Sequence, residues 1–384
     1  MARSPEPARA SRVLVISPNW LGDAVMALPA IADVRRHYPD ARMTVAARRA
    51  VAGLFHLAPV VDDVLVLEWR GKLLRRGPLQ DDLARLREVK ADIAILFPNA
   101  FSAAWITRRA GVPERWGYAA DWRRPLLSRA VGRPTRSVHQ AEYYQHLVRE
   151  LGIATSPPEP VLVVPPAAAD AARALLVARG WDASRPMVTI APGAAYGTAK
   201  QWIPAHYARL VTLLVKTEGA QCVLVGSAAD AETTRGIRDM VPESERRDVI
   251  DLAGDTTLAT LAGVMTASRA FVSNDSGAMH VASAVGVPVA ALFGPTREYE
   301  TAPLPRSGRR VEVLIHPVWC RPCMLRECPI DHRCMKRLLP ERVLACVTDL
   351  VANPEPRTPS PESRVPDPGS RIPSPGSRIP SLEP

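Results

Sequence analysis

The sequence predicts an α/β protein made of two Rossmann-like domains, each a doubly wound parallel sheet, facing each other across a cleft. The chain has 384 residues, which is enough for two domains. Hydrophobic residues make up 47% and charged residues 23%, as is usual for a folded protein. Short β-branched runs alternate with helical patterns through both halves, and this alternation predicts parallel sheets with ligands at the carboxyl ends of the strands.

The first half contains four expected strands with helical segments between them. We expect the strands at residues 13–17, 43–47, 64–67 and 93–97, because each is a short apolar run rich in β-branched residues. A Pro-rich passage at residues 155–166 then predicts a connection between domains. The sequence therefore predicts a flexible N-terminus, residues 1–11, and an N-terminal Rossmann-like domain, residues 12–160.

The same pattern restarts after the Pro-rich passage. We expect a helix at residues 167–179 and strands at residues 188–191, 222–225, 249–252, 270–273 and 287–292. These elements predict a C-terminal Rossmann-like domain over residues 161–352. Residues 353–384 contain ten prolines and a seven-residue repeat that begins at Ser363, so we expect a disordered tail without a catalytic role.

The net charge of +10 lies mostly in one stretch of the N-terminal half. Between Arg70 and Arg136 there are 15 basic and 6 acidic residues. Two interpretations remain open: a surface for an anionic partner, or a solvated Arg-rich face. No apolar run reaches the roughly 20 residues that span a bilayer, and the N-terminus lacks the apolar core of a secretory signal. We therefore expect a cytoplasmic protein whose six cysteines are thiols or metal ligands rather than disulfides.

The first chemical motif, residues 18–26, directly follows the first expected strand. It places Asp23 near the start of a helix, where free backbone N–H groups and the helix dipole favour a carboxylate. Asp23 is therefore either a capping residue or a general base aimed into the cleft. No G-x-G-x-x-G pattern follows any strand, which argues against a dehydrogenase.

Two further motifs follow strands of the C-terminal half. Residues 191–202 combine glycines, a hydroxyl and Lys200 into a plausible phosphate cradle, although an ordinary loop with an exposed lysine is the alternative. In residues 273–280, Ser276 and Gly277 would offer backbone N–H groups at the positive end of a helix. Asp275 is alternatively a helix cap, and His280 alternatively a packed core histidine. Two such turns in one domain favour a diphosphate ligand.

Four cysteines are closely spaced near the C-terminus, at Cys320, Cys323, Cys328 and Cys334. Four thiolates at short spacing can enclose a tetrahedral zinc ion. The spacing lacks the paired C-x2-C knuckles of common zinc ribbons, so reduced thiols that order a loop are the alternative.

Five ordered blocks of sequence, at residues 18–30, 97–105, 191–202, 223–232 and 273–296, resemble the lipopolysaccharide heptosyltransferases. These are inverting glycosyltransferases of family 9 with the two-domain GT-B fold, and the resemblance runs from about residue 13 to residue 350. It implies an acceptor-binding N-terminal domain and a nucleotide-sugar-binding C-terminal domain. It implies a catalytic aspartate at Asp23 and a phosphate-binding, catalytic lysine at Lys200. The remaining substrate-binding residues that it implies are Asn19, Gly22, Gly193, Thr198, Glu232 (to the ribose), Asp275, Ser276, Gly277 and His280.

The resemblance also implies the reaction and its partners. The expected activity moves L-glycero-D-manno-heptose from ADP-heptose to the inner-core heptose of lipopolysaccharide, with no cofactor and no catalytic metal. The expected acceptor is an anionic lipid A-core glycolipid, which the enzyme would bind during peripheral contact with the cytoplasmic face of the inner membrane. No nucleic-acid partner is expected. Within the family, transfer at the first or a later heptose position is the alternative. From another class, the cysteines and the basic stretch leave a zinc-containing nucleic-acid-binding protein as the alternative.

Overall fold

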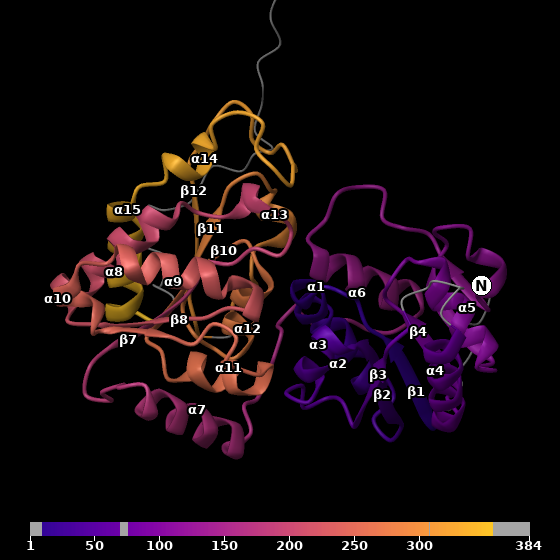
Figure 1. The fold of residues 1–384 in the computed structure, drawn as a ribbon. Helices are drawn as coiled ribbons and strands as arrows, with labels where there is room; N and C mark the ends of the chain where they lie inside the picture. Colours follow the sequence, from indigo (N-terminus) through magenta and orange to yellow (C-terminus); the bar gives the residue numbers. More distant parts are fainter. Residues whose placement is uncertain (1–9, 70–75, 307, 356–384) are drawn as a thin grey trace, which may run out of the picture.

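The computed structural model describes residues 10–69, 76–306 and 308–355, and it confirms the predicted pair of α/β domains (Figure 1). Most of the predicted flexible N-terminus and of the predicted disordered tail, residues 356–384, lies outside these ranges. Each domain contains a six-stranded, fully parallel sheet. The chain passes from one sheet to the other through residues 153–165, which form neither helix nor strand.

The first sheet has the strand order β3-β2-β1-β4-β5-β6. Its strands are β1 (Arg12–Ile16), β2 (Arg42–Arg48), β3 (Asp63–Leu67), β4 (Ile93–Leu96), β5 (Glu114–Tyr118) and β6 (Arg129–Val131). Its helices are α1 (Leu21–Met26), α2 (Leu28–His37), α3 (Arg49–Phe55), α4 (Arg76–Val89), α5 (Phe101–Arg109) and α6 (Gln140–Glu150). The four predicted strands are confirmed to within a residue or two. Strands β5 and β6 were not predicted, because they are short and carry charged residues.

The second sheet has the order β12-β11-β10-β7-β8-β9. Its strands are β7 (Met187–Ala191), β8 (Gln221–Leu224), β9 (Val249–Asp251), β10 (Ala270–Asn274), β11 (Val289–Phe293) and β12 (Val311–Ile315). The helices are α7 (Pro166–Ala178), α8 (Pro204–Glu218), α9 (Ala231–Met240), α10 (Glu243–Arg246), α11 (Leu258–Thr266), α12 (Gly277–Ala284), α13 (Glu298–Thr301), α14 (Arg333–Lys336) and α15 (Pro340–Ala352). Strand β12, at the edge of this sheet, was also not predicted.

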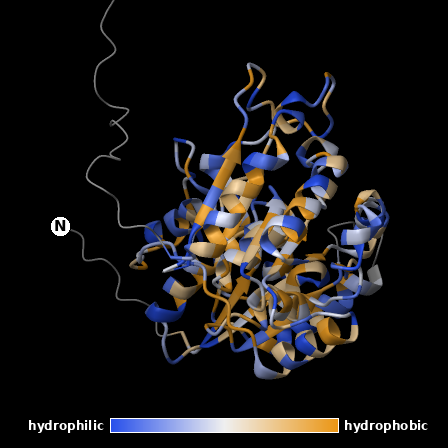
Figure 2. Ribbon diagram, turned by 90° about the vertical axis from the view of Figure 1, so that its left-hand side faces the viewer, coloured by the Kyte–Doolittle hydropathy of each residue, from blue (hydrophilic) through white to orange (hydrophobic). Residues whose placement is uncertain are grey.

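Helices cover the sheets, so the central strands are buried on both faces. Every residue of β4, β7, β10 and β11 is buried, as expected for the near-continuous apolar runs of parallel strands. Figure 2 shows the hydrophobic colour concentrated in the strands inside the molecule and the hydrophilic colour on the outer helices. Within the described residues, no helix has the length and apolar character needed to cross a membrane.

Both sheets reverse their winding direction at a comparable place. The order changes direction between β1 and β4 in the first sheet and between β7 and β10 in the second. In doubly wound folds, ligands bind beside the carboxyl ends of the strands at this switch point. The motifs that contain Asp23, Lys200 and Asp275 follow β1, β7 and β10, so the topology places all of them at the two switch points.

The domains touch through the first turns of α1 and α12, which lie between the two sheets in Figure 1. A Cβ atom on Gly277 would lie 2.7 Å from the Cβ of Leu21, and one on Gly22 would lie 3.0 Å from Cδ2 of His280. The distance at Gly277 is shorter than real Cβ atoms essentially ever show, and the distance at Gly22 is shorter than most real Cβ contacts. Glycine at these two positions therefore allows the two helices to approach each other this closely.

Asn274, the last residue of β10, fixes the loop that follows β7. Its Oδ1 accepts hydrogen bonds from the backbone N of Trp202 (2.9 Å) and from the hydroxyl of Tyr207 (2.8 Å), and its Nδ2 donates to the carbonyl of Pro192 (2.6 Å). Asn274 is fully buried. Both ends of the lysine-bearing loop, residues 192–202, are thus attached to the strand beside it.

We predict that Asn274→Ala lowers the free energy of unfolding by about 3 kcal/mol, because buried polar groups of Trp202, Tyr207 and Pro192 lose their partner. Chemical denaturation of purified protein measures this change. Tyr207→Phe is the matched control: it removes one of the three hydrogen bonds and should cost about 1 kcal/mol. Equal losses for the two variants would contradict the role of Asn274 in fixing the loop.

Candidate active site

A cavity of roughly 730 Å³ lies between the two domains, within the usual size range of small-molecule sites. The first turn of α1 supplies its wall on the first domain, and the loops after β7, β8 and β10 supply the wall on the second. The cavity brings together most of the site residues expected from the sequence. These are Gly22, Asp23, Gly193, Lys200, Asp275, Ser276, Gly277 and His280.

Asp23 lies in the first turn of α1 and lines the cavity. The N-cap residue of that helix is Trp20, and Asp23 lies in the first turn, where its own backbone N–H stabilises its carboxylate. Asp23 is therefore not the N-cap residue, although it has the position near the helix start that the sequence predicts. The hydroxyl of Tyr144 also donates a hydrogen bond to Oδ1 of Asp23 at 3.0 Å. Burial raises the pKa of Asp23 above its ordinary value, while the bond from Tyr144 and the charge of Lys200 oppose this rise. A carboxylate with a raised pKa is a stronger base than an exposed aspartate.

Lys200 and Asp275 form a largely buried ion pair, with 2.6 Å between Nζ and Oδ2. The hydroxyl of Thr296 donates to the same carboxylate oxygen at 2.6 Å. Asp275 therefore binds side chains across the cavity wall rather than capping α12, whose N-cap residue is Ser276. The ammonium of Lys200 also lies 4.7 Å from the ring centroid of Tyr196. Lys200 is thus held by a carboxylate and an aromatic face, at a place where an anionic ligand can compete for it.

The N-terminus of α12 faces the same cavity through Ser276 and Gly277. No side chain caps this helix, and the Ser276 hydroxyl hydrogen bonds to that of Ser273 at 2.9 Å. The first backbone N–H groups of α12 are therefore left for a ligand or solvent. Together with the positive end of the helix dipole, they favour an anion such as a phosphate.

His280 lies one turn into α12, buried and lining the cavity, with its ring packed against Gly22 of the other domain. Burial lowers the pKa of His280 to about 4. The imidazole is therefore neutral at physiological pH. It contributes shape and hydrogen-bonding capacity to the cavity, but no positive charge.

Three residues expected in the site lie outside this cavity. Asn19 lines a separate hollow of about 40 Å³ at the carboxyl ends of β1 and β2. Thr198 is exposed at the start of the short helical turn Thr198–Lys200, and Glu232 is exposed in the first turn of α9. In the segment between β8 and α9, the acid that does line the cavity is Asp230. Its Oδ2 accepts hydrogen bonds from the backbone N and the hydroxyl of Ser227.

The sequence motifs did not reveal every residue that shapes the site. Tyr144 is 121 residues away from Asp23, so no local pattern connects them. Asn274 and Thr296 both lie in the block 273–296. Two sequence features could have revealed Asn274 and Thr296. One is the Asn-Asp pair at the end of the buried strand β10, and the other is the Gly-Pro-Thr turn after β11.

The cysteine segment, residues 318–334, forms the outer support of the lysine-bearing loop. The hydroxyl of Tyr196 donates to the carbonyl of Met324 (3.0 Å), and the backbone N of Ala199 donates to the carbonyl of Arg326 (2.9 Å). The Nε2 of His332 hydrogen bonds to the carbonyl of Ala199 at 2.7 Å. A Cβ on Gly197 would lie 2.3 Å from the carbonyl oxygen of Arg326, so this contact requires glycine.

Of the two interpretations of the four cysteines, a zinc site or thiols that order a loop, the described residues do not support the zinc site. Cys320, Cys323, Cys328 and Cys334 are free thiols, and no group of three or more His, Cys, Asp or Glu side chains in the described part of the chain could hold a metal ion. The thiols instead belong to a loop that supports the cavity. The zinc-containing nucleic-acid-binding alternative therefore has no structural support in the described residues.

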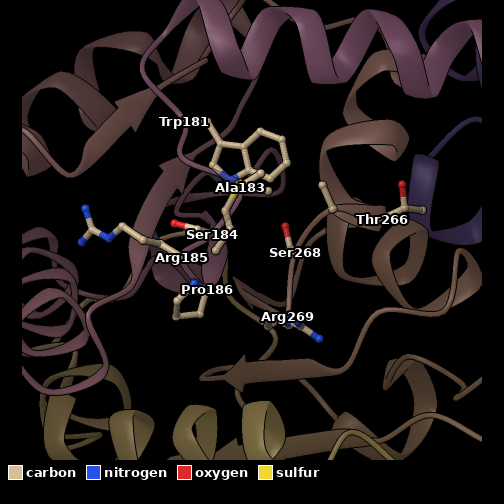
Figure 3. A pocket seen from close by; sticks show the side chains of 10 residues that line it. Trp181, Ala183, Ser184, Arg185, Pro186, Thr266, Ser268 and Arg269 are labelled. Atoms are coloured by element: carbon tan, nitrogen blue, oxygen red, sulfur yellow. The ribbon is translucent and has the colours of Figure 1, made fainter.

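A second hollow, of about 340 Å³, lies at the amino ends of the central strands β7 and β10 (Figure 3). The interdomain cavity lies at the carboxyl ends of the same strands. Among the side chains that line it, Arg185 forms an ion pair with Asp248 and donates to the carbonyl of Gly219. The hydroxyl of Ser268 is bonded to that of Thr189 at 2.6 Å. These polar groups of Arg185 and Ser268 already have partners within the protein. Doubly wound folds bind ligands at the carboxyl ends of their strands, not at the amino ends.

Comparison with known proteins assigns the chain to a family. The sequence model of glycosyltransferase family 9 (heptosyltransferase) matches residues 83–333. The chain is 31% identical over 309 residues to lipopolysaccharide heptosyltransferase 2 of Escherichia coli strain K12, covering 79% of this chain and 88% of the relative. It is 30% identical to lipooligosaccharide heptosyltransferase 2 of Haemophilus influenzae, covering 76% and 86% of the two chains.

Solved structures agree with this assignment. The ADP-heptose lps heptosyltransferase II of E. coli superposes with a TM-score of 0.76 and 28% identity, covering 89% of this chain and 98% of that one. A family 9 glycosyl transferase from Veillonella parvula, at 19% identity and a TM-score of 0.77, shares the fold over 89% and 97% of the two chains. With its two parallel α/β domains and the cavity between them, the chain belongs to glycosyltransferase family 9, the heptosyltransferases, and is a glycosyltransferase.

Proposed function

We propose that the enzyme transfers L-glycero-D-manno-heptose from ADP-heptose to the inner-core heptose of lipopolysaccharide, as heptosyltransferase II. The relatives at 30–31% identity carry the name heptosyltransferase 2 and support this stage of transfer. One observation carries the chemical part of the proposal. Asp23 of the first domain shares a cavity with Lys200 and the uncapped start of α12 on the second.

In this mechanism Asp23 acts as the general base. An acceptor hydroxyl attacks the anomeric carbon of the donor, its proton passes to the Asp23 carboxylate, and the bond from the anomeric carbon to the diphosphate oxygen breaks. Because attack and departure occur on opposite faces, the configuration inverts. The raised pKa of Asp23 favours proton transfer, and alignment of the two substrates in the cavity supplies much of the remaining rate enhancement.

Lys200 and the N-terminus of α12 stabilise the departing ADP. Its diphosphate competes with Asp275 for the Lys200 ammonium, and the N–H groups at Ser276 and Gly277 offer further donors. Such preorganised donors can balance the developing charge without a divalent ion. Asp275, once Lys200 turns to the phosphates, can accept hydrogen bonds from the donor sugar.

The basic N-terminal domain suits an anionic acceptor. Arg133 and Arg136 are exposed and, with Tyr143, line a hollow of about 380 Å³ beside α13. Positive charge at this place would steer a phosphorylated or carboxylated glycolipid toward the domain that carries Asp23. We accordingly propose a lipid A-core acceptor, presented during peripheral contact with the cytoplasmic face of the inner membrane.

The proposed function is tested by incubating the enzyme with ADP-heptose and a defined core acceptor that carries one heptose, in the presence of EDTA. Mass spectrometry should detect an acceptor with one added heptose. An acceptor without heptose is the matched control and should stay unmodified. Transfer to the heptose-free acceptor alone would instead assign the first heptosyl transfer, and dependence on a divalent ion would refute the proposed stabilisation of ADP.

We predict that Asp23→Ala lowers kcat by about 10³-fold, because the variant lacks the general base, while ADP affinity stays nearly unchanged. Isothermal titration with ADP and a steady-state transfer assay measure the two effects. In the wild type, activity should fall as the pH drops through the pKa of Asp23, since only the ionised carboxylate accepts a proton. Equal loss of ADP binding and of turnover would refute the assigned role.

We predict that Lys200→Ala weakens ADP binding by about 10- to 100-fold and slows turnover, because a charge-assisted contact with the diphosphate is lost. Titration calorimetry measures the affinity. Lys216→Ala is the matched control, because Lys216 is half-exposed, pairs with Glu245 and does not line the cavity. Unchanged ADP affinity in Lys200→Ala would show that the lysine does not contact the phosphates.

A further inference from the structure

Asp23 is held in place by a side chain that lies outside the cavity. Tyr144 comes from α6, is 4% exposed, and donates its hydroxyl hydrogen to Oδ1 of Asp23. Its ring packs edge-on against Phe97, with 5.3 Å between centroids, and α6 packs against α1 and α2. The position of the hydroxyl is therefore determined by the core of the first domain rather than by anything bound in the cavity.

The other charged and titratable groups near Asp23 act on it differently. Lys200 and Asp275 influence the carboxylate through their charges, in opposite directions, and both come from the second domain. His280 packs against the neighbouring Gly22 and is neutral. Among the residues that the structure describes, Tyr144 is the one side chain that hydrogen bonds to Asp23. The backbone N–H of Asp23 itself also stabilises the carboxylate. Oδ1 is thus the oxygen held by a side chain, and in the described residues no side chain hydrogen bonds to Oδ2.

We propose that Tyr144 is the positioning residue of the general base: its buried hydroxyl fixes Oδ1 of Asp23 so that Oδ2 meets the acceptor hydroxyl. This inference rests on the proposed function, which makes Asp23 the base. When the acceptor O–H bond breaks, the proton joins Oδ2, the acceptor oxygen bonds to the anomeric carbon, and ADP leaves with the electrons of its bond. Oδ1 can accept the Tyr144 hydrogen before and after this step, so the base keeps its orientation throughout.

Two consequences separate this role from simple support of the fold. A hydrogen bond from a fixed donor selects one orientation of the carboxylate, which affects kcat rather than donor binding. The same bond stabilises the charged form of the buried carboxylate and thereby opposes the rise in its pKa that burial causes. Loss of the bond should therefore raise the pKa of Asp23 further. Without the hydroxyl, Asp23 should therefore take up a proton at higher pH.

The test is Tyr144→Phe, which removes one oxygen atom. We expect kcat to fall by about 10- to 100-fold, with ADP affinity unchanged. We also expect the acid limb of the kcat profile to move up by about one pH unit. The carbon-13 resonance of the Asp23 carboxyl, assigned with Asp23→Asn, should titrate at a correspondingly higher pH in the variant.

Tyr118→Phe is the matched control. The Tyr118 hydroxyl is buried in the same domain and donates to the carbonyl of Tyr143 on α6, at 2.6 Å, without touching Asp23. Its loss should lower thermal stability and leave the acid limb unmoved. If both variants lose the same activity and neither moves the acid limb, Tyr144 has only a structural role and the inference is wrong.

A second substitution covers the case in which Tyr144→Phe does not fold. Placing 3-fluorotyrosine at position 144 keeps the ring and the hydroxyl but makes the hydroxyl a stronger donor, so the acid limb and the Asp23 resonance should both move to lower pH. An unmoved resonance would overturn the inference. The resonance needs no turnover, so a wild type that transfers no heptose would refute the proposed function alone.

Discussion

The close approach of α1 and α12 is the constraint on which the rest of the site depends. Gly22 and Gly277 let the two helix starts meet almost backbone to backbone. The carboxylate of Asp23, carried by one domain, is thereby brought into the same cavity as Lys200 and Asp275, carried by the other. Neither domain contains all three of these side chains. The proposed reaction therefore requires both domains and takes place where the two helices touch.

The charges in the cavity are arranged for a substrate that is not yet bound. Lys200 is paired with Asp275, while Asp23 is left with a neutral hydroxyl donor and a neutral His280 beside it. Burial makes ionisation of Asp23 costly, and the hydrogen bond from Tyr144 offsets part of that cost. Asp23, the proposed base, is therefore hydrogen bonded within the first domain, and Lys200, the proposed phosphate ligand, forms its ion pair within the second.

Motifs at the ends of buried parallel strands were predictable from sequence, because a strand, its turn and the following helix are contiguous. Asp23, Lys200, Asp275 and His280 were found in this way. Tyr144 was not, since its contact with Asp23 depends on how α6 packs against α1. Strands β5, β6 and β12 were missed because charged residues interrupt their short apolar pattern, and β6 and β12 are edge strands. Glu232 was predicted to bind the ribose, yet in the segment after β8 the acid that lines the cavity is Asp230.

The cysteine segment affects how experiments with thiol reagents must be interpreted. Three of its thiols, Cys320, Cys323 and Cys328, are partly accessible, and the segment is bonded to the loop of Tyr196 and Ala199. An alkylating agent can thus disturb, from outside, the end of the cavity where we propose that the nucleotide binds. Inactivation by such an agent, or protection by ADP, would report on the mechanical support of this loop and would not identify a catalytic cysteine.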